Sequence, residues 1–189
     1  MTLKYDRCII KAEKMERMMD LSQFKEISPE NIKDNIFSLI SKEWMLIGAT
    51  DGKKANAMTA SWGGVGVMWN KNVVCAVIRP QRYTKEFVDS SDYFTLSFFD
   101  ESYRETLGYF GRVSGRDEDK IAKTGLTIKN IENNAVGFKE AKMIVVCKKL
   151  YASPLISEGF IDKTLIDANY KDGDFHVAYI GEIVKVLEK

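Results

Sequence analysis

The chain has 189 residues, of which 45% are hydrophobic and 29% are charged, a composition typical of one globular domain with a sizeable core. Lys and Arg total 28 against 27 Asp and Glu, so the chain lacks the basic excess of nucleic-acid-binding proteins. Residues 1–15 lack the apolar core of a secretory signal, and no apolar run reaches the ~18 residues of a membrane span.

The three cysteines form no C-x-x-C pair, and two of them lie in apolar runs. An odd number of unpaired thiols is typical of a reducing compartment. We therefore expect a cytoplasmic protein that binds neither nucleic acid nor membrane.

The N-terminal segment 1–27 is predicted to be an arm, with helical spacing over residues 12–21. Such a helix packs on its own subunit or on a neighbouring one. Ser28-Pro29-Glu30 is a helix-start signal, which predicts a helix over 29–42 at the beginning of a domain spanning 28–189.

From Trp44 the hydrophobic period changes to that of strands. Strands are predicted at 44–50, 54–63 and 73–79, with turns at Asp51-Gly52 and at 69–72. Further on, we expect strands at 93–99, 142–151 and 175–187, with a bulge or bend at Gly181. Short helices are expected at 84–91, 102–110 and 117–123, and residues 157–167 stay ambiguous. This order favours a mainly β barrel decorated by helices over a doubly wound parallel sheet.

A glycine-rich run, Gly63 to Val67, contains G-x-G but is followed by a turn and a strand. A dinucleotide fingerprint must open a helix, so this run is rejected as one. We expect its glycines to let the backbone bend or approach a ligand.

The stretch from Asn56 to Trp62 (NAMTASW) has small and polar residues where a core strand carries Val, Ile and Leu. Small side chains leave backbone amides and carbonyls within reach of a flat polar ring such as an isoalloxazine. The alternative is an edge strand with no ligand.

The stretch from Arg79 to Thr84 (RPQRYT) is a stiff turn with two guanidiniums, followed by a helix start. Guanidiniums and helix N-termini both bind phosphate. The alternative is a pair of surface arginines in salt bridges. A ring-binding strand beside a phosphate-binding turn fits a flavin mononucleotide, FMN.

No catalytic constellation accompanies these stretches. His176 is the only histidine, and neither a nucleophile motif nor a metal-ligand cluster surrounds it, so no metal site is expected. It is more simply a structural histidine, or it lines a ligand pocket. Near Ser114 and Gly115 a loop meets a helix, which Asp117 is expected to cap.

These stretches, together with FGRVSGRDEDK and HVAYIGEI, resemble the flavin reductase-like family of FMN-binding split barrels, over about residues 28–189. The resemblance implies a six-stranded split β-barrel with Greek-key character, a homodimer, and FMN ahead of FAD as the cofactor. It implies that the ring and ribityl chain contact Asn56, Ala57, Met58, Thr59, Ser61 and Trp62, that the phosphate end contacts Arg79, Arg82, Tyr83 and Thr84, and that Ser114, Gly115 and His176 lie near the site.

The function expected from this resemblance is an NAD(P)H-dependent flavin reductase, in which the flavin does the chemistry and the protein orients it. NADH or NADPH is then the electron donor. One alternative is a flavoredoxin-type electron carrier reduced by a redox protein. Another is a module that binds flavin without catalysis.

Overall fold

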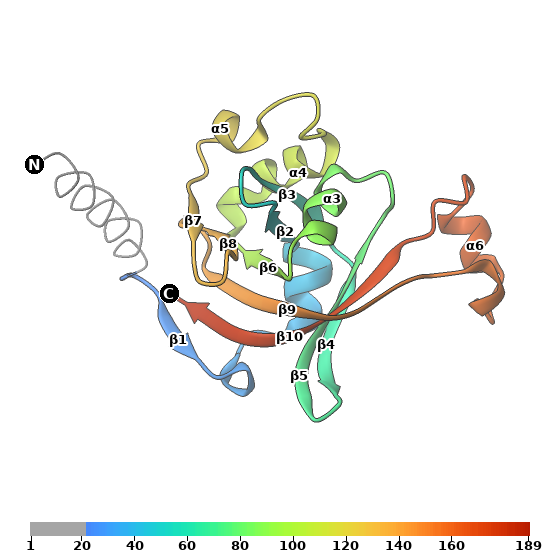
Figure 1. The fold of residues 1–189 in the computed structure, drawn as a ribbon, viewed down its shortest axis with the longest axis horizontal. Coiled ribbons are helices and arrows are strands. Elements are labelled where there is room, and N and C mark those ends of the chain that lie inside the picture. Colours follow the sequence, from blue (N-terminus) through green and yellow to red (C-terminus); the bar gives the residue numbers. More distant parts are fainter. Residues whose placement is uncertain (1–21) are drawn as a thin grey trace, which may run out of the picture.

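The computed structural model describes residues 22–189, which form one large antiparallel sheet flanked by short helices (Figure 1). The strand order is β3-β2-β6-β9-β10-β5-β4, and β1 pairs with β10 as an extra strand. The strands are β1 (Lys25–Ile27), β2 (Met45–Thr50), β3 (Ala55–Ala60), β4 (Gly63–Met68), β5 (Lys71–Ile78), β6 (Tyr93–Phe98), β9 (Met143–Pro154) and β10 (Val177–Glu188).

The helices are short and lie mostly between strands. They are α3 (Tyr83–Ser90), α4 (Arg104–Arg112), α5 (Lys120–Thr124) and α6 (Thr164–Asn169), with 3₁₀ turns at Pro29–Asn31, Glu101–Tyr103 and Ser157–Gly159. A small second sheet pairs β7 (Ile128–Asn130) with β8 (Val136–Phe138). No helix within residues 22–189 is long and apolar enough to cross a membrane.

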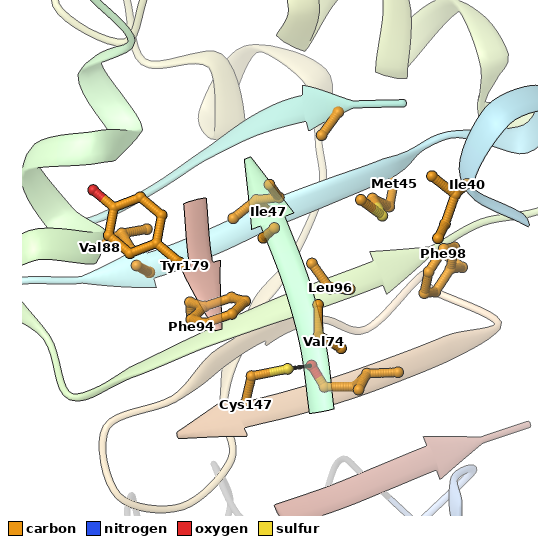
Figure 2. Close-up of a cluster of buried hydrophobic side chains, with 14 of the residues drawn as sticks. Ile40, Met45, Ile47, Val74, Val88, Phe94, Leu96, Phe98, Cys147 and Tyr179 are labelled. Atoms are coloured by element: carbon orange, nitrogen blue, oxygen red, sulfur yellow. Dashed lines mark hydrogen bonds between the residues drawn. The ribbon is translucent and has the colours of Figure 1, made fainter. Parts of the chain in front are cut away.

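The main core lies inside the sheet, where side chains of β2, β5, β6, β9 and β10 meet (Figure 2). Strand β6 is buried on both faces: Phe94, Leu96 and Phe98, each about 1% exposed, pack in this core, and the intervening Thr95 and Ser97 are buried on the opposite face. Tyr179 of β10 is also buried, and its hydroxyl donates to Asp89 Oδ1 at 2.6 Å. This bond satisfies the one polar atom of the ring and fixes α3 against the sheet.

The connection from β3 to β4 bends sharply at Gly63, where φ is +140°. A Cβ there would lie 2.6 Å from the Cys75 carbonyl oxygen, so only glycine fits. The predicted bend is confirmed, although the expected strand 54–63 ends at Ala60 and a separate strand, β4, follows it. The expected turn after β4 is also confirmed, with Trp69 and Asn70 both in the left-handed region.

The segment between β9 and β10 leaves the sheet and carries α6 at its far end (Figure 1). This segment contains residues 157–167, for which the sequence predicted no clear element. They form the 3₁₀ turn Ser157–Gly159 and the start of α6. The β10 strand then returns beside β9 and β5, and its register shifts between Ile180 and Gly181. The irregularity predicted at Gly181 is therefore confirmed, although the extra residue, Leu150, belongs to β9. A Cβ at Gly181 would lie within 3.0 Å of the Phe94 ring and of Cys147 Cβ.

The predicted helix over 29–42 is wrong. The chain makes a 3₁₀ turn at Pro29–Asn31, leaves the helical conformation, and restarts as α2 (Ile36–Ser38), which continues as a π-helix (Leu39–Glu43). The reason is local: Ser28 donates to the Glu30 carboxylate instead of capping backbone N–H groups, whereas Asn35 does cap, accepting from Ser38 N at 3.1 Å. The true helix start was therefore Asn35. The expected helix over residues 12–21 lies outside the described residues.

Candidate functional site

Two adjoining pockets open beside β3. The first, about 170 Å³, is lined by Met58, Thr59, Ala60, Ser61, Trp62, Val77, Arg79, Arg82 and His176. The second, about 140 Å³, is lined by Asn56, Met58, Gln81, Arg82, Tyr83, Thr84, Arg112, Val113, Ser114, Gly115 and Lys120. They share Met58 and Arg82, and only together do they reach the ~300 Å³ lower end of small-molecule sites.

The shape of the pockets follows from the small residues of β3. This strand is an end strand of the sheet, so one of its backbone edges is free of strand pairing. Asn56 is 6% exposed, and its Nδ2 donates to Thr84 Oγ1 of α3 at 3.0 Å. Gly115 packs so closely on Asn56 that a Cβ at that position would overlap the amide. Glycine is therefore required to bring the loop before α5 onto β3.

Two cations converge on the second pocket. Arg82 Nη1 donates to the Gly111 carbonyl at 2.7 Å, and Lys120 Nζ donates to the carbonyls of Ala57 at 2.8 Å and Phe110 at 3.2 Å. Lys120 is only 3% exposed. Burial first, and the Arg82 charge second, lower the pKa of Lys120 to about 8. Burial, and then the Arg79 charge, also lower the pKa of Arg82.

Within residues 22–189, neither cation of this donor set pairs with a carboxylate. Arg82 and Lys120 bond carbonyl oxygens instead, and both carry a desolvation cost that a bound anion would offset. Thr84 and the first turn of α3 add hydroxyl and N–H donors on the same side. The residues present therefore fit the phosphate end of a flavin.

Arg79 lies elsewhere than expected for a phosphate ligand. It lines the first pocket and not the second, its guanidinium pairs with Asp174, and it donates to the Asn169 carbonyl at 2.8 Å. It also lies over the Tyr170 ring, 5.2 Å from the centroid. The alternative given for this turn, arginines in salt bridges, thus describes Arg79. Its contacts connect the end of β5 to the segment before β10.

His176 lines the first pocket next to Trp62, with ring centroids 5.2 Å apart. Its Nδ1 lies 2.9 Å from the Tyr170 hydroxyl, and the imidazole is 8% exposed. Burial first, and then the Arg79 charge, lower the pKa of His176 to about 4. At neutral pH the ring is therefore uncharged, which suits a surface for an apolar or aromatic group rather than a second anion site.

All predicted cofactor-binding residues except Ala57 line one of the two pockets. Ala57 is fully buried, and its backbone carbonyl accepts a hydrogen bond from Lys120 Nζ. The sequence interpretation missed Lys120 and Arg112, although both lie in the FGRVSGRDEDK motif that supported the resemblance. From the sequence, a lysine directly after the Asp119 cap is expected to be an ordinary exposed helix residue. Only its burial in the structure indicates that Lys120 belongs to the candidate site.

An open antiparallel sheet flanked by short helices, with pockets beside its end strand β3, is the architecture of a split barrel. Residues 37–189 match the model of the flavin reductase like domain, and the chain belongs to that family. The membership supports an oxidoreductase-type function with a bound flavin. No curated protein matches the chain.

Several solved structures share the fold. The flavoredoxin of Desulfovibrio vulgaris (Miyazaki F) is 25% identical with a TM-score of 0.61, over 77% of this chain and 69% of that one. Nitrilotriacetate monooxygenase component B of Bacillus cereus is 19% identical with a TM-score of 0.60, over 85% and 79%. The NADH:FAD oxidoreductase of Streptomyces globisporus C-1027, solved with NAD and FAD fragments, is 14% identical with a TM-score of 0.57, over 78% and 74%.

Proposed function

We propose that this protein is an NAD(P)H-dependent flavin reductase whose two joined pockets hold the flavin ring, ribityl chain and phosphate. The observation that carries the proposal is a pair of cations at one end of a strand of small residues, the half-buried Arg82 and the buried Lys120, which within residues 22–189 bond carbonyl oxygens and no carboxylate. FMN is the smallest flavin that supplies both a ring and a phosphate, and a bound flavin would supply the electron-transfer chemistry.

The chain's own residues act by holding and shaping. Arg82 and Lys120 hold the phosphate, and Asn56 and Gly115 fix the loop that brings Lys120 onto β3. Met58, Thr59 and Ser61 offer small or flexible side chains and backbone to the ring, while the contacting rings of Trp62 and His176 form an aromatic wall of the first pocket. Because His176 is uncharged, this wall can accept a flat nicotinamide as well as a flavin.

A spectroscopic titration tests this function. FMN is added to the purified protein, and NADH or NADPH is then added without oxygen. We expect saturable FMN binding and rapid loss of the visible flavin absorbance with one of the two nucleotides. Absence of flavin binding would refute the site itself. Binding without reduction by either nucleotide would refute the reductase.

The second candidate is a flavoredoxin-type electron carrier, favoured by the 25% identity to a flavoredoxin. Under this alternative the FMN-loaded protein is reduced by a reduced ferredoxin and not by NADH or NADPH. The two functions are separated by comparing those reductants at equal protein concentration. Lack of electron transfer from reduced ferredoxin would count against the carrier.

We also propose that the protein is a homodimer. The hairpin of β4 and β5 presents apolar side chains to solvent, with Val67 74% and Trp69 55% exposed, and Val65 and Met68 beside them. Val65 and Val67 alternate along β4 and therefore lie on one face of the strand. Several exposed apolar side chains on one hairpin are typical of an association surface. Light scattering should give twice the chain mass, and Val67→Glu should shift it to the monomer; a monomeric wild type would refute the proposal.

A further inference from the structure

A cavity of about 600 Å³ lies at the N-terminal end of α4, apart from both flavin pockets. Arg104 and Leu107 of α4 line it, whereas Arg112, at the other end of the same helix, lines the second flavin pocket. None of its lining residues lines either flavin pocket. Its volume is within the range of small-molecule sites, and the flavin assignment uses no part of it.

Arg104 is held in place before any ligand binds. Its guanidinium lies over the Trp44 ring, 3.2 Å from the centroid, and its Nη1 donates to the carbonyls of Lys42 at 2.5 Å and Glu43 at 3.3 Å. These are the last carbonyls of the π-helix Leu39–Glu43, and such carbonyls have no partner inside the helix. Within residues 22–189 both bonds come from Nη1, so the N–H groups of Nε and Nη2 are left for a ligand. A guanidinium can bind a carboxylate through two such groups.

The backbone below this arginine is strained. Trp44 has φ +69° and ψ 171°, a region that is favourable for glycine and unfavourable for a bulky residue. The π-helix that ends at Glu43 is also a rare conformation. Both features are frequent at functional sites, where the fold holds side chains in one geometry. Here the strained residue is the one whose ring stacks on Arg104, so the strain lies where the guanidinium is fixed.

The same cavity carries carboxylates close to this cation. Asp100 and Glu101, at the start of the 3₁₀ turn before α4, are exposed and line the cavity. Lys142 and Glu43, which also line it, already pair with each other at 2.7 Å. The two free acids disfavour a ligand that is only an anion, and Arg104 disfavours one that is only a cation. A ligand with both charges satisfies both sets.

The remaining lining is apolar or carries an apolar stem. Phe99 and Leu107 are 3% and 2% exposed, so the cavity reaches the edge of the core. Lys42 adds a second exposed cation on a hydrocarbon stem. A free α-amino acid joins an ammonium and a carboxylate at one carbon, with its side chain beside them. An apolar side chain on that carbon matches the apolar part of this lining.

We propose that this cavity binds a free α-amino acid with an apolar side chain. Arg104 takes the carboxylate, and Asp100 and Glu101 take the ammonium. The apolar side chain lies against Phe99 and Leu107. The site is separate from the flavin pockets and does not depend on the function proposed above.

The test measures the Kd of L-phenylalanine by calorimetry in the full chain. Two matched probes each lack one charge: 3-phenylpropionate has no ammonium, and phenethylamine has no carboxylate. Arg104→Gln removes the cation, and the double variant Asp100→Asn with Glu101→Gln removes the acids without touching Arg104. Glu105→Gln, at an exposed α4 residue outside the lining, is the control. Thermal unfolding verifies that the variants fold.

We expect L-phenylalanine to bind roughly tenfold or more tightly than either matched probe, the scale of one charge-assisted hydrogen bond. Arg104→Gln and the double variant should each weaken its binding by a similar factor, and Glu105→Gln should not.

No binding of L-phenylalanine, or equally tight binding of 3-phenylpropionate, would overturn the inference. Unchanged affinity in the double variant, or in a folded Arg104→Gln, would overturn it as well. So would displacement of L-phenylalanine by saturating FMN, because the amino acid would then occupy the flavin pockets. None of these outcomes changes the reading of the flavin titration.

Discussion

Replacing Lys120 by Met should separate the stability of the protein from its affinity for flavin. The drop in the pKa of Lys120 from 10.5 to about 8 corresponds to an electrostatic cost of about 3 kcal/mol for holding the charged form at pH 7. Methionine removes that cost but leaves the carbonyls of Ala57 and Phe110 without their donor, at about 1–3 kcal/mol each. We therefore expect little net change in the free energy of unfolding of the flavin-free protein.

Flavin affinity should respond differently. A charge-assisted bond from Lys120 to phosphate contributes about 1.5–3 kcal/mol, so Lys120→Met should weaken FMN binding by roughly 10- to 150-fold. Lys123→Met, on the same helix but 61% exposed, is the control and should bind FMN as the wild type does. Calorimetry gives both affinities, and chemical denaturation gives both stabilities. Equal FMN affinity in Lys120→Met and the wild type would refute the reasoning.

The same lysine makes binding depend on pH. In the free protein Lys120 loses its proton as the pH rises through about 8, and a bound phosphate raises its pKa again, so binding above that pH takes up a proton. FMN affinity should be constant between about pH 7 and pH 8, where the phosphate, with a second pKa of about 6, is fully ionised, and it should fall above pH 8. Calorimetry at pH 8.5 in buffers of different ionisation enthalpy measures this uptake, and Lys120→Met should abolish it; an uptake that persists in the variant would assign the proton elsewhere.

Three further changes test the remaining parts of the site. Arg82→Ala should cost a large part of the FMN affinity, by about 2 kcal/mol or more, with the circular dichroism spectrum kept; unchanged affinity places the phosphate elsewhere. Gly115→Ala should weaken FMN binding by forcing Asn56 aside, whereas Gly64→Ala, with open space around it, should not. Wild-type thermal stability should rise between about pH 4 and 6.5, because the folded state keeps His176 neutral while the unfolded chain binds a proton; His176→Gln should flatten that rise, and an equal rise in both would contradict it.

The sequence predicted most of the sheet because its signals are local. Strand period, the Asp51-Gly52 turn and the irregularity at Gly181 each depend on a few neighbouring residues, and the structure has all three. The prediction of a helix from Pro29 was wrong because it also depended on a local signal, which a side-chain contact overrode. A start signal was present, but the Ser28 hydroxyl bonded a side chain, and the chain could restart at Asn35.

The sequence predicted which residue types line the candidate site, but not which of its charged side chains are buried or paired. Residue types predicted a ligand at Asn56 and Arg82, yet the two arginines of the turn looked alike. Nothing near them in the sequence shows that, of the two, Arg79 is the one that forms an ion pair with Asp174. Lys120 was invisible as a site residue because its partners lie 63 and 10 residues away in the chain. Burial decides the role of a lysine, and burial is a property of the fold.

The free edge of β3 has a consequence for how this protein aggregates when it is heated. An unpaired strand edge invites pairing with another chain, and long or exposed edges are therefore usually blocked. Here the blocking groups include the Lys120 ammonium on the Ala57 carbonyl and the packing of α4, whose Leu107 carbonyl accepts from the Thr59 hydroxyl. Heat that detaches α4 and α5 would uncover this edge before the core melts. Aggregation should then begin below the unfolding midpoint of the sheet, and a ligand bound against β3 should delay it.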